Sequence, residues 1–525
     1  MSSKKIVALP LSWEFAQVAE VATLFRGVTY QKSEAMKNAS NGYLPVLRAT
    51  NITGVGLTFE QLVYVPQSCV SLDQMLATGD VVVASSSGSK DVVGKAGQLL
   101  GEKFVGSFGA FCTAIRPASS LKPAFLGYYF QSPNYRRAIS DMAAGSNINN
   151  IKSSDLSGHL VPVAPCCEQV RIVAKLDELL SDLDAGIAEL KAGQRKLALY
   201  RQSLLKAAVE GALTADWRAR NPPTETGAQL LERILEQRRA RWETRQLARF
   251  KEQGKVPPKD WYDNYPEPVR PDVDGLPALP QGWAWASGEQ ICEFITKGTT
   301  PPKGMNAGED KTIPFLRVTN LSDIGELDLT DRVFVSDRTH RDFLARSVVL
   351  PNDVLMNIVG PPLGQVVVVP RTYGEWNVNQ AIAIFRAVDG VAPGFVCRYL
   401  MSPSAQQWLL TRSKTTAGQT NLTLEVCRSL PFPLPPEGEQ LQLVVELNGV
   451  LDAVQSQLHA IDIAFKQCAA QRKGILRAAF AGQLVPQDPT DEPASELLAR
   501  IRAERAAQAG KTTSTRGRRK AVQPV

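Results

Sequence analysis

Two stretches of this chain, about 270 residues apart, carry nearly the same sequence, and this duplication limits the fold to two copies of one plan. Leu44–Asn51 (LPVLRATN) corresponds to Ile313–Asn320 (IPFLRVTN) at an offset of 269 residues. Gln202–Leu213 corresponds to Lys473–Leu484 at an offset of 271 residues. A nearly constant offset between such distant anchors indicates tandem duplication of a globular module followed by a helix. Two similar modules on one chain suggest a ligand with two halves.

Each copy ends in a long helix with a coiled-coil pattern. Apolar residues recur in alternating steps of three and four over Val173–Ala208 and again, 271 positions later, over Val444–Ala479. The pattern predicts an apolar seam along one side of each helix. Each helix should span about 43 residues, or about 65 Å, and Gly211 and Gly482 stand where C-terminal caps belong. The matched registers favour packing of the two helices against each other. A twofold axis relating the two repeats would make the helices antiparallel and place one globular module at each end of the pair.

Each long helix follows a globular module built from short β-type runs. Asp80–Ala84 and Asp353–Met356 are two such runs, and glycine, serine and asparagine separate the runs from one another. This punctuation predicts an irregular, largely antiparallel sheet. Helical stretches follow at Phe125–Met142 and Phe395–Ser413, each containing a Ser-Pro pair. The expected fold class is α/β: two mixed α/β modules separated by an antiparallel coiled coil, with an internal pseudo-twofold.

The duplication also sets the expected domain boundaries. They are residues 1–165 for the first module, 166–213 for the first long helix, 214–277 for a charged and proline-rich extension, 278–435 for the second module, 436–484 for the second long helix, and 485–525 for a helical extension with a basic tail. The first extension contains a charged helix around Gln229–Glu252, whose start, Gln229–Ile234, resembles Glu496–Ile501. Beyond Gln508 the chain is polar and basic, which favours disorder.

The charge distribution permits nucleic-acid binding without requiring it. The formal net charge is +7 over 525 residues, and hydrophobic residues make up 44%, as in an ordinary folded protein. Residues 1–165 carry 14 Lys+Arg against 10 Asp+Glu, whereas residues 278–435 carry 14 of each. The eight cysteines are scattered, and neither a signal peptide nor an apolar run of membrane length is found. These features predict a cytoplasmic protein with reduced thiols.

The sequence contains no constellation of residues that would carry catalysis or hold a cofactor or metal. The three histidines, His159, His340 and His459, do not cluster, and no glycine-rich loop ends in the Lys-Ser/Thr pair of a nucleotide site. Asn221–Thr224 (NPPT) resembles the Asn-Pro-Pro-aromatic tetrapeptide of adenine-N6 methyltransferases. Thr224, however, stands where the aromatic that stacks on the base belongs. A polar turn explains this tetrapeptide better, and the sequence predicts a non-catalytic chain.

Polar loops are the remaining candidates for a functional surface. In the first module, Ser85–Lys95 is rich in short donors, and Ala144–Lys152 contains three asparagines and a lysine. In the second module, Lys414–Asn421 takes the place of the asparagine loop, and Asn379–Gln380 precedes a strand. Asn and Gln can pair with adenine and Arg or Lys with guanine, while Ser and Thr can hold phosphates. Ordinary turns use the same residues for backbone reasons, but two equivalent polar loops together favour binding.

The duplicated frame and these motifs resemble one known family, the DNA-specificity subunits of Type I restriction-modification systems. The resemblance covers nearly the whole chain. It rests on the helix ends Leu204–Gly211 and Ile475–Gly482 and on the proline-rich module ends Val161–Pro165 and Phe432–Pro436. The first module is especially similar to the enteric, K-type members in five stretches: Arg26–Tyr30, Ser86–Lys90, Val92–Lys95, Ser107–Cys112 and Gly145–Lys152.

The resemblance implies a division of labour between this chain and its partners. Each module is then a target-recognition domain that reads one half of a split, asymmetric double-stranded DNA site, and the paired helices act as a ruler for the spacer. Two modification subunits dock on the helices and methylate adenine N6 in each half-site with S-adenosylmethionine. Two restriction subunits add translocation and cleavage driven by ATP with Mg²⁺. This chain itself would bind no cofactor.

On this basis we expect three sets of functional side chains and no catalytic or metal-binding residue. The first half-site should be contacted by Arg26, Thr29, Tyr30, Arg48, Asn51, Ser87, Ser89, Lys90, Lys95, Asn147, Asn149, Asn150 and Lys152. The second half-site should be contacted by Arg317, Asn320, Asn379, Gln380, Lys414, Thr415, Gln419 and Asn421. Partner subunits should be contacted by apolar residues near the helix ends: Leu204, Leu205, Val209, Ile475, Leu476 and Phe480.

Two other classes of function remain open on sequence grounds. A scaffold could use paired helices to join two protein-binding modules. A gel shift with the modification subunits, on random and on methylated DNA, would separate that class from a specificity subunit. A methyltransferase acting through Asn221 would bind the methyl donor on its own, and we expect no such binding.

Overall fold

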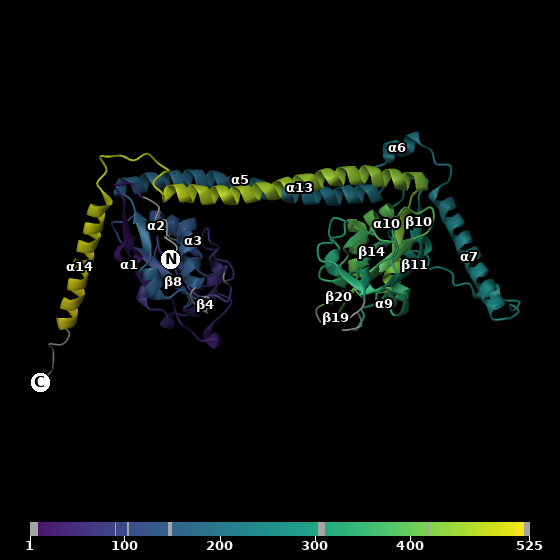
Figure 1. Ribbon diagram of the computed structural model, residues 1–525, viewed down its shortest axis with the longest axis horizontal. Helices are drawn as coiled ribbons and strands as arrows, with labels where there is room; N and C mark the ends of the chain where they lie inside the picture. The colour runs from purple at the N-terminus through teal and green to yellow at the C-terminus, as the bar shows by residue number, and fades with distance from the viewer. Residues whose placement is uncertain are drawn as a thin grey trace. The chain divides into compact units, whose positions relative to one another are not determined.

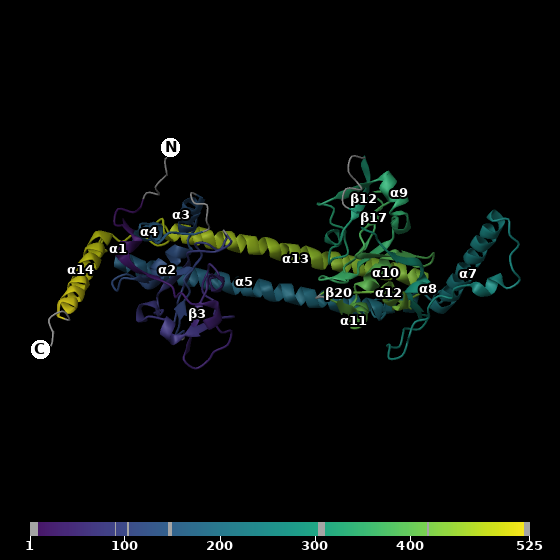
Figure 2. The ribbon, with the colours of Figure 1, turned by 90° about the horizontal axis from the view of Figure 1, so that it is seen from below.

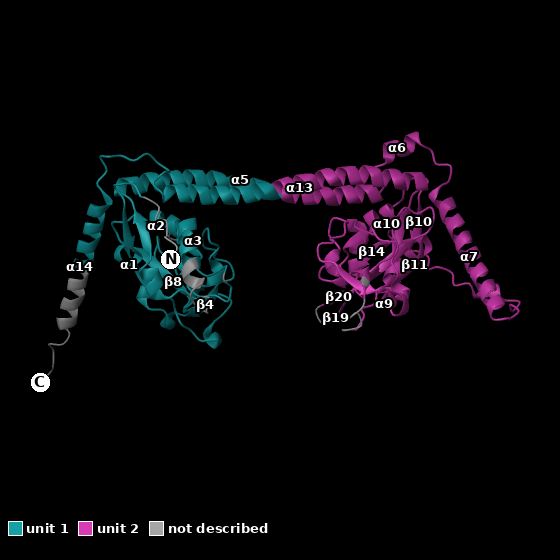
Figure 3. Cartoon of the chain, in the orientation of Figure 1, with its two compact units in different colours: residues 1–191, 462–525 teal, residues 192–461 magenta. Residues whose placement is uncertain are grey.

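The computed structural model describes residues 9–89, 91–101, 104–144, 150–302, 310–416 and 419–518. The chain forms two compact units, coloured separately in Figure 3: unit 1 consists of Met1–Lys191 with Asp462–Val525, and unit 2 consists of Ala192–Ile461. Each unit holds one globular module and a part of both long helices, α5 (Cys166–Val209, 44 residues) and α13 (Glu437–Ala479, 43 residues). The mixed α/β class and the two long helices are confirmed.

Module 1, the globular part of unit 1, places a four-stranded antiparallel sheet between two apolar cores. Its strands and helices are β1 (Glu14–Gln17), α1 (Val18–Val21), β2 (Ala22–Arg26), β3 (Tyr43–Leu47), β4 (Val63–Pro66), β5 (Val81–Ala84), β6 (Ala96–Gln98), β7 (Ser107–Phe108), β8 (Cys112–Pro117), α2 (Pro123–Gln131), α3 (Pro133–Ala144), α4 (Ser153–Ser157) and β9 (Leu160–Val163). The sheet has the order β2-β8-β5-β6. Two smaller sheets, β4-β3-β7 and β1-β9, complete the module, and among its described strands only β3 and β7 pair in parallel.

The central strand β5 shows why a continuous apolar run forms this sheet. Val81 and Val83 belong to the core on one face. Val82 and Ala84 belong to the core on the other face. Because successive side chains of a strand point to opposite faces, only a run of four apolar residues can fill both cores at once. The strand predicted at Asp80–Ala84 is therefore confirmed.

Module 2, the globular part of unit 2, repeats this topology. Its strands and helices are β10 (Ala284–Ser287), α8 (Gly288–Ile291), β11 (Cys292–Lys297), β12 (Lys311–Leu316), β13 (Val333–Ser336), α9 (Asp337–Asp342), β14 (Val354–Asn357), β15 (Val359–Gly360), β16 (Val366–Val368), β17 (Asn377–Val378), β18 (Ile382–Ala387), α10 (Pro393–Leu400), α11 (Pro403–Thr411), β19 (Lys414–Thr416), β20 (Gln419–Asn421), α12 (Leu424–Ser429) and β21 (Pro431–Leu434). The sheets β11-β18-β14-β16, β13-β12-β17 and β10-β21 match those of module 1, and β15-β20-β19 is additional.

The helical stretch predicted after the sheet is broken at its Ser-Pro pair in both modules. Ser132 stands between α2 and α3, and Ser402 ends the turn between α10 and α11. Both serines have extended backbones, because the residue before a proline is pushed out of the helical region. The Ser402 hydroxyl then accepts from the Ala405 amide at 3.3 Å, which caps the second helix.

Within each unit, the beginning of one long helix packs against the end of the other. In unit 1, Leu176 and Leu180 of α5 share a core with Leu476 of α13. In unit 2, Leu204 of α5 shares a core with Leu447 of α13. The first helix after each sheet lies between the sheet and the long helices, as Figure 1 shows for α2 and α10. In unit 1 the seam therefore joins the core of the module, whereas in unit 2 it forms a separate cluster with Trp283 and Phe395 of the module.

Shorter helices follow each of the long ones. α6 (Ala215–Arg220) and α7 (Gly227–Glu252) belong to unit 2, and α14 (Ala494–Arg518) follows α13 in unit 1. α7 confirms the charged helix predicted at Gln229–Glu252. α14 extends from Ala494 to Arg518, and the disorder expected beyond Gln508 stays a prediction. No proline interrupts the sequence between Ala494 and Arg518, so the backbone can continue as a helix.

The two extensions dock on their modules through equivalent arginines. Arg238 of α7 donates to the carbonyl oxygens of Glu289 (2.8 Å) and Cys292 (2.5 Å), at the end of α8. Arg505 of α14 donates to the carbonyls of Ala19 and Ala22, at the end of α1. A guanidinium suits these sites because the last carbonyls of a helix lack partners within it. The sequence match between the two extensions therefore extends to their docking.

Candidate DNA interface

Each module is anchored to a long helix by a tryptophan and a buried glutamate. The indole nitrogen of Trp13 donates to Oε2 of Glu168 at 2.9 Å, and Trp283 donates to Glu439 at 2.9 Å. Both glutamates lie in the first turn of their helices and are 1% exposed. Burial raises the pKa of the Glu168 carboxyl. These two hydrogen bonds attach each module to its long helix through residues outside the polar loops. The loops therefore stay free to bind a ligand.

Four loops of module 1 meet around a hollow of about 550 Å³. The hollow is lined by Val28–Tyr30, Lys32, Arg48–Thr50, Ser86–Gly88 and Gly109–Cys112. Four residues expected to contact DNA, Thr29, Tyr30, Arg48 and Ser87, are thus brought together from three separate loops. A concave site that combines hydroxyls, a guanidinium and an aromatic ring suits the edge of a base and its phosphate.

Two residues of this hollow were missed by the reasoning from sequence. Lys32 adds a second positive charge to the lining. Phe111 leaves 69% of its surface exposed, so it gives the hollow an apolar wall that can meet a thymine methyl group. The available signal was an aromatic residue in the turn between β7 and β8, where module 2 has Ala381. Single apolar residues in turns are too common to be identified without their surroundings.

Arg48 and its counterpart Arg317 hold equivalent positions with different charge environments. The Nε atoms of both are buried and have no hydrogen-bond partner in the described part of the protein. Arg48 donates through Nη2 to the carbonyl of Gln61 at 3.0 Å. Arg317 donates through Nη2 to a carboxylate oxygen of Asp331 at 2.6 Å. The charge of Arg317 is therefore partly neutralised, whereas Arg48 keeps its charge for a ligand at the hollow.

Asn51 and Asn320 were expected to contact DNA, and the structure corrects this expectation. Both are 2% exposed. The Oδ1 of each accepts the backbone amide three residues earlier at 2.9 Å, closing the short 3₁₀ turns Ala49–Asn51 and Val318–Asn320. Their Nδ2 atoms donate to backbone carbonyls, at 2.9 Å to Glu60 and to Asp328 respectively. Amides used in this way stabilise the turn that presents the arginine and cannot read a base.

The asparagine loop of module 1 pairs with the segment that follows β5. Asn150 forms an antiparallel bridge with Ser86, and the Ile151 amide donates to the Ser85 carbonyl at 2.8 Å. Asn150 is exposed beside the serine loop that lines the hollow. Three predicted contacts, Lys90, Asn147 and Asn149, lie outside the described residues.

The other predicted residues of module 1 lie near the hollow in sequence but do not line it. Arg26 is exposed at the end of β2, and Ser89 is exposed in the loop after β5. Lys95 is half-buried next to β6. Lys152 is exposed at the N-cap of α4. Their contacts with DNA stay predictions.

In module 2 the hairpin β19–β20 takes the place of the asparagine loop. β20 pairs with β15 through Val359 and Gly360, just as the loop of module 1 pairs with the segment after β5. The hairpin carries four predicted residues: Lys414, Thr415, Gln419 and Asn421. The first three are exposed, and Asn421 is half-buried.

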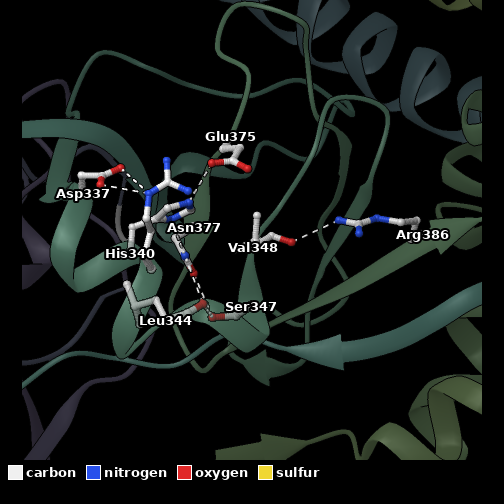
Figure 4. Close-up of polar contacts among 9 residues, drawn as sticks. Asp337, His340, Leu344, Ser347, Val348, Glu375, Asn377 and Arg386 are labelled. Carbon is white, nitrogen blue, oxygen red and sulfur yellow. Dashed lines mark hydrogen bonds and ion pairs between the residues drawn. The ribbon is translucent and has the colours of Figure 1, made fainter. Parts of the chain in front are cut away.

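The turn after β17 presents the remaining candidates of module 2. Gln380 is exposed, and the Oδ1 of Asn379 accepts the Ala381 amide at 3.2 Å. A buried network holds the strand just before this turn (Figure 4): Asn377 donates through Nδ2 to Nδ1 of His340 at 2.9 Å and accepts from Ser347 Oγ at 2.8 Å. This geometry leaves the proton of His340 on Nε2, which faces Glu375 at 3.1 Å. The network positions the turn.

Five of the six residues expected to contact partner subunits are buried inside the chain and the sixth, Ile475, is half-buried, which corrects a second expectation. Leu204 and Leu205 lie in the core between the helices of unit 2, and Val209 lies in the core of module 2. Leu476 and Phe480 lie in the core of unit 1, with Ile475 packed against it. The heptad seam is used by the other helix and by the module, because that burial stabilises the unit itself.

The Asn221–Thr224 tetrapeptide forms a turn at the end of α6. The Nδ2 of Asn221 donates to the carbonyl of Trp217 at 2.8 Å, so the amide that a methyltransferase would offer to adenine is used within the chain. In the described residues, no group of three or more His, Cys, Asp and Glu is arranged to hold a metal ion. No helix there is long and apolar enough to cross a membrane. All eight cysteines are free thiols.

Comparisons with known proteins place this arrangement in a family. The family described as "Type I restriction modification DNA specificity domain" matches residues 10–192. The EcoKI specificity subunit of Escherichia coli (strain K12) is 30% identical over 523 residues, covering 96% of this chain and 98% of that protein. The StySPI specificity subunit of Salmonella potsdam is 29% identical over 535 residues, with the same coverage of 96% and 98%. Both are Type I restriction enzyme subunits.

A solved chain supports the fold independently. It comes from work on complex assembly and conformational transition of the type I R-M system, and it matches with a TM-score of 0.62 at 18% identity, covering 91% of this chain and 100% of that chain. Two α/β modules on one frame, bearing different polar loops, define the class of two-module specificity subunits. The chain belongs to the family of Type I restriction enzyme specificity subunits, as its sequence predicted.

Proposed function

We propose that the chain reads a bipartite, asymmetric DNA site, with one module on each half-site. The observation that carries this proposal is the use of one frame with different side chains at the same places. Module 1 offers a hollow with Arg48, Tyr30 and Phe111, whereas module 2 offers a polar hairpin and Gln380. Different side chains on an identical frame read different bases, so two such modules match an asymmetric target.

The two long helices act as a ruler for the spacer between the half-sites. We infer an antiparallel coiled coil with a pseudo-twofold relation between the repeats. The matched heptad registers support this inference, as does the packing of the beginning of one helix against the end of the other within each unit. A continuous helix of 44 residues is stiff enough to hold a fixed separation.

Two modification subunits and two restriction subunits complete the assembly in the cytoplasm. The modification subunits methylate adenine N6 with S-adenosylmethionine, and the restriction subunits use ATP and Mg²⁺; this chain supplies recognition. Since the seam residues are internal, docking falls to the outward helix faces. Val170 is 50% exposed, and its equivalent Leu441 and nearby Val445 are 55% and 67% exposed. Exposed apolar side chains at matching positions on both helices suit two copies of one partner.

A genome-wide map of N6-methyladenine in the source cell tests this function. The expected result is one split motif with a constant spacer, which disappears when the gene for this chain is deleted. The assembled modification complex should then shift a duplex with that motif in preference to random DNA. A complex that assembles but shows no DNA preference would favour the scaffold function instead. Methyl-donor binding by the isolated chain would favour a methyltransferase.

A further inference from the structure

The central extension of unit 2 forms an arm that its module does not bury. We define the arm as Arg238–Pro266, the outer part of α7 with the segment that returns along it. Leu230 and Ile234, nearer the start of α7, are buried in the core of module 2. From Arg238 onward, no residue of the arm is fully buried. In Figures 1 and 2, α7 projects away from the sheet of module 2.

A small aromatic cluster orders the arm. Trp242 of α7 stacks on Trp261 of the returning segment, with ring centroids 5.7 Å apart and planes at 19°. Tyr265 meets the edge of Trp242 at 5.4 Å, and Phe250 meets Trp261 at 6.2 Å. Aromatic pairs of this kind stabilise a structure beyond the effect of the area that they bury. The arm therefore holds its side chains in place although it lies outside the module core.

The arm has a net positive charge, unlike the module that it extends. It contains eight Lys+Arg and four Asp+Glu, whereas residues 278–435 contain 14 of each. Three of its arginines are used inside the unit: Arg238 on carbonyl oxygens, Arg239 with Glu243 at 3.2 Å, and Arg245 with Glu293 at 3.0 Å.

Five other basic side chains of the arm form no ion pair with the described residues. They are Arg241, Arg249, Lys251, Lys255 and Lys259, and all but the half-buried Arg241 are exposed. The surface they form is rich in lysine, which protein–protein interfaces avoid at their centres. Long, exposed cations instead match the phosphates of a duplex, which carries about one charge per 1.7 Å of helix axis. Charge complementarity therefore favours DNA as the occupant.

The far end of the arm also points in a suitable direction. In Figures 1 and 2 it lies on the same side of α13 as α9, the helix whose His340 helps hold the Asn379–Gln380 turn. A duplex lying on the loops of module 2 and continuing outward would pass the arm. We propose that the arm binds the phosphate backbone of DNA flanking the half-site of module 2, without reading bases. This inference rests on the proposed function, because it takes the loops of module 2 as the DNA surface.

The test compares the complete modification complex with a variant carrying R249Q, K251Q, K255Q and K259Q. Binding is measured against salt on two duplexes with the mapped motif, one ending at the edge of the second half-site and one extending about two helical turns beyond it. On the long duplex the slope of log Kd against log salt should fall by about 2 to 3.6, since each lost phosphate contact removes about 0.9. On the short duplex the variant and parent should agree, and the methylated motif should be unchanged.

A matched control changes charge on the same arm in the opposite sense. E252Q with D260N should strengthen binding to the long duplex and raise its salt slope, because the arm becomes more basic. Both variants change exposed residues, and thermal unfolding should show parental stability. Equal slopes for parent and variants on the long duplex would overturn the proposal. Impaired assembly of the glutamine variant with modification subunits, at an unchanged slope, would assign the arm to a protein partner. A parent complex without a bipartite motif would instead contradict the proposed function.

Discussion

Module 1 and module 2 share their frame down to single hydrogen bonds and differ at the surface that the frame presents. In module 1, Arg116 forms a bidentate pair with the buried Asp80, with bonds of 2.9 and 2.7 Å. In module 2, Arg386 forms the same pair with Asp353 at 2.8 and 2.7 Å. Each guanidinium also lies over a phenylalanine ring of the first sheet strand, at 4.7 and 4.4 Å. Stability is thus provided by residues that both modules keep.

The differences lie in the loops and at one core position. The segment after β5 is an open serine loop beside a hollow, whereas the corresponding segment after β14 becomes β15 of an extra sheet. In the core, the Tyr129 hydroxyl meets Nε2 of His159 at 2.8 Å. Tyr129 also donates to the Leu160 carbonyl at 3.1 Å, as its counterpart Tyr399 does to the Pro431 carbonyl, but in module 2 Leu430 replaces the histidine. Because the ion pairs that stabilise the frame lie outside these loops, the loops can diverge, as the proposed reading of two different half-sites requires.

The largest expected effect comes from changing the distance between the modules while leaving both frames intact. Deleting one heptad from each long helix, Ile187–Gly193 and the equivalent Leu458–Ala464, removes about 10 Å of rise. Methylation of the native motif should fall by a factor on the order of 10³, because only one half-site can be bound at a time. A motif with a spacer shorter by about three base pairs should be methylated instead, as sequencing of modified DNA would reveal.

The control deletes only one of these heptads, which breaks the matched seam. Methylation should then be lost for every spacer. Methylation of the native spacer at the parental rate by the double deletion would contradict the ruler.

Breaking the buried ion pair of the shared frame should lower the stability of both modules by the same amount. Asp80→Ala and Asp353→Ala should each destabilise their own module by about 3–5 kcal/mol, because each leaves an arginine without its buried partner. Hydrogen exchange of peptides from each module, at rising denaturant, measures the two effects separately. Asp337→Ala is the control, since its pair with Arg341 is exposed to solvent and its loss should change the stability of the module far less. If the two substitutions destabilised their modules by different amounts, the equivalent ion pairs would not contribute equally to stability.

His159, which packs against Tyr129 in module 1 and is replaced by Leu430 in module 2, should make the stability of module 1 depend on pH in acid. Burial lowers the pKa of His159 to about 4, below the ordinary value of about 6.5. Between these two values, His159 is therefore protonated in the unfolded chain and neutral in the folded module. The resulting contribution of His159 to the unfolding free energy of module 1 is fully present above about pH 6.5. It falls by up to about 3 kcal/mol as the pH is lowered toward 4. His159→Leu, which copies Leu430, should remove this dependence from the unfolding free energy of module 1. A pH profile of module 1 that is unchanged in the variant would refute the assignment.

The smallest effect is expected from the equivalent arginines of the two surfaces. Arg48→Ala should relax recognition of one half-site by about 1–3 kcal/mol, measured as methylation of variant motifs. Arg317→Ala should relax only the other half-site, and by less, because Asp331 already neutralises part of its charge. Both variants should keep parental stability. If both variants lowered the base preference at the same half-site, the result would contradict the proposal that each module reads a different half-site.

The sequence by itself determined the duplication, the two long helices, the strands predicted at Asp80–Ala84 and Asp353–Met356, and the family. These features are periodic or repeated, and periodicity is a local property that a chain displays before it folds. Tertiary structure decided which polar residues face a ligand. Asn51 looks like a base-reading residue until the Glu60 carbonyl accepts a hydrogen bond from its amide, and Leu476 looks like a docking residue until it is buried in the core that it shares with Leu176. Such assignments depend on contacts between distant residues, since burial and hydrogen bonding are settled only when the loops and helices meet.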